Sequence, residues 1–367
     1  MKKILHLQLL PLLSGVQRVS LNEIQEILQE FSHDIEYQMA CSSFGPLTKK
    51  LDEIGVVTHV IPTLKREISP YNDIVSIYHI YKLVRREKYD VVHTHSSKTG
   101  FVGRIASKLA GSKKIIHTVH GFSFPAANSF SAKLCFFIME WLAKFFTDQL
   151  IVLNNADREI AIYKLGYNNK AVKVVPNGVD VDLFSPADKT SNEFRIVMVG
   201  RLWKQKNPMC LLRAFKKVVE IDSSITLDFV GDGDLRHEML SFIENNNLSR
   251  NVKIVGWKDD VFNLLNSYDL FVLPSLWEGM PLAILEAQSC GLPTVVSDIA
   301  GNRDLVTDGF NGLLFETNND DILFEAMKRL YLDRNELKRF SNNARNNVLQ
   351  NFSNKKRNLD VMSIYLS

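Results

Sequence analysis

The sequence predicts an α/β protein with two domains, each a parallel sheet with helices on both faces. Three observations lead to this. The chain has 367 residues, which exceeds one ordinary hydrophobic core. Short apolar runs alternate with longer helical patterns, as in parallel strands joined by crossover helices. A polar segment at residues 185–192 interrupts the alternation, so we place the boundary there, between domains 1–180 and 186–349.

The first domain alternates strands and helices from its first residues onward. The apolar runs predict strands at residues 4–10, 35–41, 56–61, 90–95, 114–119, 148–153 and 172–175. The helical patterns predict helices at residues 16–31, 47–54, 72–87, 99–110 and 131–146. The start resembles a signal peptide, but Gln8 and Pro11 interrupt its apolar run and no small-residue cleavage site follows, so we interpret it as a strand.

The second domain repeats the pattern. Strands are expected at residues 195–199, 225–230, 252–255, 268–273, 294–297 and 312–315. Helices are expected at residues 207–221, 235–246, 261–266, 281–290 and 302–306, and from 320 to the end. Pro208 and Pro281 suit the first turn of a helix, and Gly291 suits a helix end.

Composition limits the classes of function. The chain is 46% hydrophobic and 23% charged, as in soluble globular proteins, and its net charge of +3 is too small to indicate nucleic-acid binding. The four cysteines have no metal or redox spacing, which favours reduced thiols in a cytoplasm. The most apolar stretch, residues 134–146, is too short and too charged to span a bilayer.

The rest of the chain is organised around residues 274–287, where a buried strand, a loop and a helix follow one another. Gly279 lies where the backbone turns, and the N–H groups at Gly279, Met280 and Leu282 would point out of the helix start, an anion site. Glu278 lies on the loop. Glu286 follows Leu282 by one helical turn, so both can face one ligand.

A second motif lies between the strand at 195–199 and its helix. Arg201 and Lys206 are free to converge there on one anion, Arg201 as a two-pronged donor and Lys206 as a point charge. Gly15 occupies the corresponding position after the first strand of the chain, where backbone N–H groups can approach a diphosphate. An ordinary loop glycine is the alternative for Gly15, and solvated cations are the alternative for the other pair.

Polar residues also end two strands of the first domain. His93 and His95 alternate along one strand, but we disfavour zinc because no cysteine or third ligand is nearby. We expect His95, Ser96 and Lys98 to line a cleft and touch an acceptor, although plain loop residues are equally compatible with the pattern. His120 ends the next strand beside Gly121, where an imidazole can bond a hydroxyl.

Together these motifs resemble the retaining glycosyltransferases of family 4, with the Glu-x7-Glu segment from Glu278 to Glu286 as the central match. The resemblance covers nearly the whole chain, although only one glycine, Gly15, stands where the family often has two. It implies a GT-B fold, with two Rossmann-like domains facing across a cleft and a C-terminal helix, about residues 350–367, that packs back on the first domain.

The resemblance also implies the chemistry. Arg201, Lys206 and the backbone N–H groups at Gly279, Met280 and Leu282 would stabilise a departing nucleoside diphosphate without a metal or cofactor. Pro281, which has no N–H, would contact the donor within the same segment. Glu286 would bind the ribose, Glu278 the donor sugar, and His120 the sugar from the other domain. The family retains anomeric configuration, and the departing phosphate itself takes the acceptor proton. The donor is expected to be a UDP-sugar carrying a hexose or N-acetylhexosamine.

The acceptor is expected to be a glycan or polyprenyl-linked glycan in bacterial capsule, O-antigen or exopolysaccharide assembly. Arg104 and Lys108, with aromatic residues of the 131–146 helix, form a face that could rest on the inner leaflet of the plasma membrane. A buried helix is the alternative. Rival functions are a GT-B sugar-nucleotide epimerase, a non-catalytic sugar-nucleotide-binding protein, and a solute-binding protein, for which no export signal is convincing.

Overall fold

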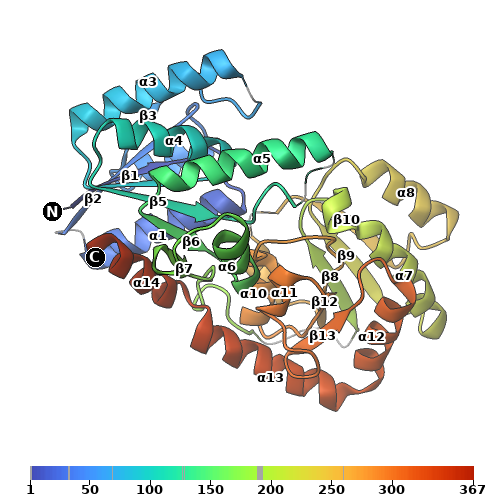
Figure 1. The fold of residues 1–367 in the computed structure, drawn as a ribbon. Coiled ribbons are helices and arrows are strands. Elements are labelled where there is room, and N and C mark those ends of the chain that lie inside the picture. The colour runs from blue at the N-terminus through green and yellow to red at the C-terminus, as the bar shows by residue number, and fades with distance from the viewer. Residues whose placement is uncertain are drawn as a thin grey trace. The chain divides into compact units, whose positions relative to one another are not determined.

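The computed structural model describes residues 2–367 apart from 32, 33, 68, 126, 128, 188–192 and 259. The chain divides into two compact units, residues 1–177 with 354–367 and residues 178–353. We call them unit 1 and unit 2 (Figure 1). Most of the polar segment in which we placed the domain boundary, residues 188–192, lies outside the described residues.

Unit 1 is a seven-stranded parallel sheet in the order β3-β2-β1-β4-β5-β6-β7. Its strands are β1 (Lys2–Leu7), β2 (Ile35–Cys41), β3 (Val57–Val60), β4 (Val91–His95), β5 (Lys114–Val119), β6 (Gln149–Val152) and β7 (Val172–Val174). Its helices are α1 (Gly15–Phe31), α2 (Pro46–Asp52), α3 (Pro70–Glu87), α4 (Ser97–Leu109), α5 (Phe130–Ala143), α6 (Asn155–Glu159) and α14 (Asn354–Leu366). Short helical turns η1 (Lys144–Phe146), η2 (Ile160–Lys164) and η3 (Asn169–Ala171) complete it.

Two apolar layers cover the faces of this sheet. Successive residues of a strand point to opposite faces, so Ile4 packs with α1 and α14 while Leu5 packs with α3 and α4. Figure 1 shows α14 beside α1, and Tyr365 of α14 is fully buried in this layer. The last helix of the chain therefore belongs to unit 1.

Unit 2 is a six-stranded parallel sheet in the order β10-β9-β8-β11-β12-β13. Its strands are β8 (Arg195–Val199), β9 (Thr226–Val230), β10 (Val252–Gly256), β11 (Leu270–Leu273), β12 (Thr294–Ser297) and β13 (Gly312–Phe315). Its helices are η4 (Lys204–Lys206), α7 (Pro208–Ile221), α8 (Arg236–Asn245), α9 (Val261–Leu265), α10 (Leu282–Ser289), α11 (Ala300–Arg303), α12 (Asp320–Leu332) and α13 (Arg334–Asn351).

The predicted α/β class is confirmed, with small differences at element ends. The first strand ends at Leu7 instead of residue 10, and the helical stretch formed by α6 and η2 was not predicted. That stretch is short and mostly without the long apolar periodicity that identifies a helix. Among the described residues, no helix is both long and apolar enough to cross a membrane.

Candidate functional site

The candidate donor site lies at the carboxyl ends of β8 and β11 in unit 2. The strand order runs outward from β8 to β9 and β10 on one side and to β11 on the other. Doubly wound sheets bind ligands where the order reverses in this way. The loop after β8 carries Arg201 and Lys206, and the loop after β11 carries Glu278. The topology therefore places both predicted motifs at one position.

Hydrogen bonds join these two loops directly. The backbone N–H of Leu276 donates to the carbonyl of Gln205 at 2.8 Å. The side-chain amide of Gln205 donates to the carbonyl of Trp277 at 2.9 Å. The cations of one loop and the acid of the other are thus held in fixed register.

Lys206 and Glu278 form an ion pair at the centre of this arrangement. The ammonium of Lys206 lies 2.5 Å from Oε1 of Glu278, and the hydroxyl of Ser275 donates to the same oxygen at 2.7 Å. The side chains are only 18% and 8% exposed, respectively. An ammonium has three donors, so Lys206 can hold this carboxylate and still contact a second anion.

Arg201 is placed differently from Lys206. It is half-buried, and its guanidinium lies 4.7 Å from the centre of the Trp203 ring. Among the residues that the structure describes, no hydrogen bond or ion pair engages this guanidinium. Stacking on an aromatic face orients a guanidinium without neutralising it. Arg201 is consequently a positioned cation with its charge available.

Two glycines let neighbouring segments of unit 2 approach these loops closely. A Cβ on Gly231, whose φ is +148°, would lie 2.0 Å from the carbonyl oxygen of Gly200. Gly231 therefore provides the space that the backbone of Gly200 needs. A Cβ on Gly301 would lie 2.4 Å from the carbonyl oxygen of Gly279. The role of Gly301 was not predicted from the sequence, because a glycine at a helix start gives no sign of the distant loop that it contacts.

The predicted helix start after Gly279 is confirmed. Pro281 caps α10 with φ −74° and ψ 120°, and α10 ends before Gly291, whose φ is +77°. Glu286 lies one turn beyond Leu282 and is 9% exposed. The first N–H groups of a helix lack intrahelical acceptors, so the geometry is compatible with anion binding. The ligand contacts of Gly279, Met280, Leu282 and Glu286 remain predictions.

In unit 1, Gly15 and His120 also follow central strands. Gly15 is exposed and begins α1, and half-buried His120 directly follows β5. Ser96, just after β4, has φ +65° and ψ 149°. This region of backbone space is nearly restricted to glycine, and such strain is commonly found at functional sites. The donor contacts of Gly15 and His120 remain predictions.

The other predicted acceptor residues are engaged inside unit 1. His95 is fully buried, and its ring nitrogens lie 3.1 Å from His6 and 3.2 Å from His120. The ammonium of Lys98 donates to the carbonyl of Glu67 at 2.7 Å and pairs with Asp73 at 2.6 Å. In this arrangement neither side chain offers a free polar group to an acceptor.

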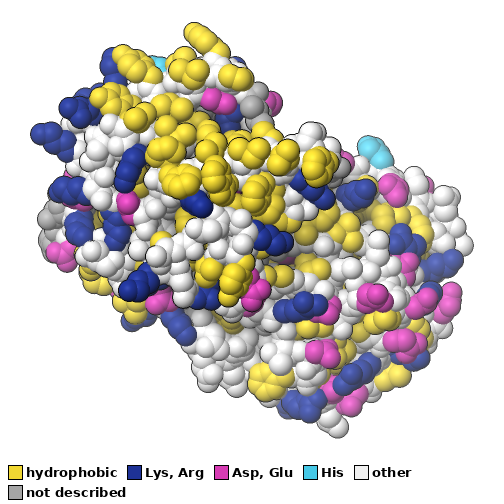
Figure 2. Space-filling model, in the orientation of Figure 1, with side chains coloured by type: hydrophobic (Ala, Val, Ile, Leu, Met, Phe, Trp, Pro, Cys, Tyr) yellow, Lys and Arg dark blue, Asp and Glu magenta, His cyan; other side chains and the backbone are white. Residues whose placement is uncertain are grey.

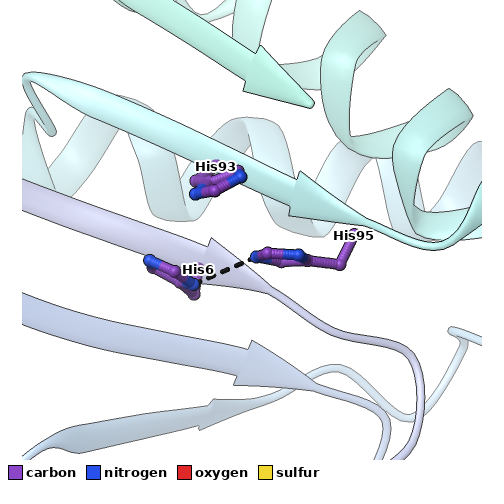
Figure 3. A group of neighbouring side chains, drawn as sticks. All are labelled: His6, His93 and His95. Atoms are coloured by element: carbon purple, nitrogen blue, oxygen red, sulfur yellow. Dashed lines mark hydrogen bonds between the residues drawn. The ribbon is translucent and has the colours of Figure 1, made fainter. Parts of the chain in front are cut away.

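The basis on which we disfavoured a metal at His93 and His95 is corrected. The third histidine is His6, which lies opposite His93 in the β1–β4 register, and the three rings lie close enough to hold a metal ion (Figure 3). Each of their nitrogens, however, already has a hydrogen-bond partner within unit 1. Burial lowers the pKa of His6 to about 4 and that of His120 to about 3, so both rings are neutral near pH 7.

The chain contains two Asp-x-Asp triplets, and carboxylates in this pattern commonly hold the metal of metal-dependent transferases. They are residues 180–182 and 232–234. Asp180 accepts from the backbone N–H groups of Asp182 and Leu183 at 3.1 and 2.9 Å. Asp232 accepts from that of Gly233 at 2.8 Å. Asp180 thus caps a turn, and Asp232 also pairs with Arg236 at 3.4 Å. Independence of a metal remains a prediction.

Comparison with known proteins identifies the family. The model described as "Glycosyltransferase Family 4" matches residues 13–183, and that described as "Glycosyl transferases group 1" matches residues 182–347. A UDP-Gal:alpha-D-GlcNAc-diphosphoundecaprenol alpha-1,3-galactosyltransferase of Escherichia coli is 44% identical, over 99% of this chain and 96% of its own length. The chain belongs to the family 4 glycosyltransferases. The predicted family and enzyme class are thereby confirmed.

Other relatives agree. The N,N'-diacetylbacillosaminyl-diphospho-undecaprenol alpha-1,3-N-acetylgalactosaminyltransferase of Campylobacter jejuni is 27% identical over 83% of this chain and 84% of its own. Among solved structures, Anabaena Alr3699/HepE in complex with UDP and glucose matches with a TM-score of 0.86 at 20% identity, covering both chains fully. This likeness confirms the predicted GT-B fold.

The main motifs of the site could be predicted because they follow strand ends. The contacts made by Gly301 and Ser275 were not predicted.

Proposed function

We propose that this glycosyltransferase transfers a hexose, specifically galactose, with retention of anomeric configuration and without a metal. The donor is UDP-galactose and the acceptor an N-acetylglucosamine carried on diphosphoundecaprenol. One observation supports the assignment of the site. Arg201, whose guanidinium pairs with no described acid, lies on the same loop as Lys206, and Lys206 pairs with Glu278 at the amino end of α10. The choice of substrates is supported by the 44% identical relative and its name.

The charges account for the first half of the reaction. Breaking the bond between the sugar C1 and the phosphate oxygen leaves UDP with an added negative charge. Arg201, the ammonium of Lys206 and the first amides of α10 would stabilise that charge as it grows, which lowers the barrier more than it strengthens donor binding. Two cations with helix amides can supply this stabilisation without an added ion.

The second half of the reaction needs a proton acceptor and a held sugar. The acceptor hydroxyl forms the new bond to C1 on the face that UDP leaves, and its proton passes to the departing phosphate oxygen. Glu278, fixed by Lys206 and Ser275, is suited to hold donor-sugar hydroxyls, and Glu286 to hold those of the ribose. Contact of His120 with the sugar rests on the family resemblance.

The test incubates purified protein with UDP-galactose, UDP-glucose, UDP-N-acetylgalactosamine or UDP-N-acetylglucosamine. The acceptor is GlcNAc-diphosphate on a short lipid, and the matched control is GalNAc-diphosphate on the same lipid. UDP-galactose with the GlcNAc acceptor is expected to give UDP and an α-linked disaccharide, equally with and without EDTA. Loss of activity in EDTA that added divalent ions restore would contradict the metal-free mechanism.

The same assay separates the rival functions. An epimerase would convert the UDP-sugar without any acceptor, and a binding protein would be stabilised against heating by UDP-sugars yet release no UDP. A preference for a different UDP-sugar would correct the donor and leave the assignment of the site intact.

We also propose that α5 and η1 rest on the membrane that carries the acceptor. Hydrophobic side chains gather over the α5 region of the surface (Figure 2). Exposed members of α5 and η1 are Phe130, Leu134, Ile138, Trp141, Leu142 and Phe145. Aromatic and aliphatic residues on one helix face, with Lys133 exposed beside them, are typical of interfacial helices.

The basic part of this predicted face is corrected at Arg104, whereas Lys108 is exposed and lies 3.7 Å from Asp148. Arg104 is fully buried, where its guanidinium pairs with Glu140 at 2.8 Å and contacts Tyr167 at 3.2 Å. Arg104 thus ties α4 to α5 and cannot reach a lipid headgroup. The attraction is accordingly expected to be mainly apolar, with weak dependence on salt.

Flotation with vesicles tests this surface. Phe145→Asp, at a position 59% exposed, is expected to lower the fraction bound to phosphatidylcholine–phosphatidylglycerol vesicles several-fold. Phe310→Asp is the matched control in unit 2, at a position 50% exposed, and is expected to bind as the unaltered protein does. Equal binding by both variants would exclude the α5 face.

A further inference from the structure

A continuous ladder of hydrogen bonds crosses unit 1 from α1 to the residue after β5. The hydroxyl of Tyr365 donates to Glu23 at 2.5 Å, and Nε2 of His6 lies 3.1 Å from that hydroxyl. Nδ1 of His6 lies 3.1 Å from Nε2 of His95, and Nδ1 of His95 lies 3.2 Å from Nε2 of His120. The ladder thus links Glu23 to His120 through one phenol and two imidazoles.

The protons of this ladder are fixed at its Glu23 end. Glu23 is fully buried with Arg357, whose guanidinium donates to its second oxygen at 2.8 Å. As a paired carboxylate, Glu23 can only accept, so the single proton of Tyr365 points to it. The oxygen of Tyr365 must then accept from Nε2 of His6.

The contacts of His93 are consistent with this assignment. Its Nδ1 lies 2.6 Å from the Tyr365 hydroxyl and its Nε2 lies 2.7 Å from the Thr118 hydroxyl. With the Tyr365 proton given to Glu23, His93 donates from Nδ1 and accepts the Thr118 proton at Nε2. Every contact then joins one donor to one acceptor.

The order of donors then passes along the ladder. A neutral imidazole has one N–H and one lone pair, so His6 donates from Nε2 and accepts at Nδ1. His95 must donate from Nε2 to His6 and accept at Nδ1, and His120 must donate from Nε2 to His95. Burial lowers the pKa values of these four histidines, which keeps the rings neutral as this count requires.

We propose that this ladder fixes His120 as its Nε2–H tautomer, so that it meets a ligand with Nδ1 as a hydrogen-bond acceptor. Tyr365, His6 and His95 are then positioning residues, and the C-terminal helix sets the polarity of a site residue at the far end of the sheet. The partner of Nδ1 is a hydroxyl that donates. That this hydroxyl belongs to the donor sugar rests on the proposed function, whereas the tautomer does not.

The ladder also has a consequence for specificity. A site that accepts a proton from a hydroxyl binds an analogue without that hydroxyl far more weakly, because the lone pair is left unpaired. A fluorine in place of the hydroxyl accepts but cannot donate, so it is expected to be no better than hydrogen at that position. A histidine free to change tautomer would tolerate the fluorine.

The direct test is nitrogen NMR on the full chain with 15N-labelled histidine, which distinguishes protonated from unprotonated ring nitrogens. The His120 signals are identified by their loss in His120→Asn. His6, His95 and His120 are expected as Nε2–H tautomers and His93 as Nδ1–H. An Nδ1–H tautomer at His120, or stoichiometric zinc in the purified protein, would overturn the proposal. The tautomers are read from the unaltered protein, and His120→Asn serves only to identify the His120 signals.

Tyr365→Phe tests whether the C-terminal helix imposes the order. It removes the acceptor for Nε2 of His6, so mixed tautomers are expected at His6, His95 and His120. Tyr89→Phe is the matched control, because it deletes the hydroxyl of a buried tyrosine of unit 1 that donates to Gln38 and is not part of the ladder. Unchanged tautomers in a folded Tyr365→Phe would refute the role of α14.

A binding measurement keeps the two proposals distinguishable. The tautomers can be as expected while Tyr365→Phe lowers the affinity for the UDP-sugar about tenfold and leaves the affinity for UDP unchanged. Both the ladder and the sugar contact of His120 then hold. If the tautomers are as expected but neither ligand is affected, the ladder holds and the sugar contact fails. Tautomers other than those expected, together with normal sugar transfer, would refute the proposed role of the ladder and leave the proposed function intact.

Discussion

The two units place different chemistry at the same point of the same topology. In each sheet the strand order reverses beside the first strand, at β1–β4 in unit 1 and at β8–β11 in unit 2. Unit 1 gathers neutral, buried histidines there, whereas unit 2 gathers a half-buried Arg201 and the Lys206–Glu278 ion pair. The fold selects where a ligand lies, and the side chains decide whether the site binds charge or orients neutral hydroxyls.

The largest expected effect is a selective loss of unit 1 stability in acid. Burial lowers the pKa of His6 from 6.5 to about 4, and shifts His93, His95 and His120 in the same direction. The unfolded chain therefore binds more protons than the folded one between these values, and stability falls as the pH falls from 6.5 toward 4. Each such histidine contributes about 1.4 kcal/mol per pH unit within its window. Glu23 opposes the shift of His6, while Arg357 reinforces it.

Amide hydrogen exchange at pH 7 and pH 5 measures this difference, after correction for intrinsic exchange rates. Protection in β1 and β4 is expected to fall by several kcal/mol, and protection in β8 and β11 much less. His6→Gln is expected to reduce the pH dependence, and His237→Gln, at an exposed position in unit 2, to leave it unchanged. Equal acid sensitivity of the two sheets would remove the contrast between the units.

Arg201→Ala tests the charged side of the comparison. Removing a half-buried, positioned cation that contacts a diphosphate is expected to weaken UDP binding by about 2–4 kcal/mol, measured by calorimetry. Lys204→Ala is the matched control, because Lys204 is an exposed cation in the same loop after β8, and its removal is expected to cost less than about 0.5 kcal/mol. Equal losses in both variants would mean that general charge, and not a positioned guanidinium, binds UDP.

The sequence predicts the unit 2 site better than the unit 1 site for a physical reason. Strand ends, glycines and proline-led helix starts are local, so the positions of Arg201, Lys206 and Glu278 follow from short segments. The pairing of Lys206 with Glu278 already requires the order of β8 and β11. The local sequence pattern predicts where a loop begins, but the order of the strands determines which other loop lies beside it.

Features of unit 1 that escaped prediction all depend on distant partners. His6 joins His93 only through the register of β1 and β4, and Tyr365 reaches both from the end of the chain. Arg104 was assigned to the surface because its partner Glu140 lies on another helix. A charged residue is seldom fully buried unless an oppositely charged residue pairs with it. A single sequence does not reveal which residue that is.

The smallest expected effect, and the sharpest one within unit 2, belongs to Glu278→Gln. The change removes the carboxylate that Lys206 and Ser275 share and keeps the shape of the side chain. Because the Lys206 ammonium is then free for phosphate, affinity for UDP is expected to stay the same or to rise slightly. Affinity for the UDP-sugar relative to UDP is expected to fall by about 1–2 kcal/mol, the scale of a hydrogen bond to a charged group.

Titration calorimetry with UDP and UDP-galactose on the same variant separates the two contributions. Ser275→Ala is the control, since it removes one hydrogen bond to Glu278 and leaves the charge in place, so a smaller loss is expected. If Glu278→Gln weakens UDP as much as UDP-galactose, Glu278 acts by positioning Lys206 for the phosphates and not by holding the sugar. Unit 2 would then bind only the nucleotide, and the neutral histidines of unit 1 would be the remaining candidates for binding the sugar.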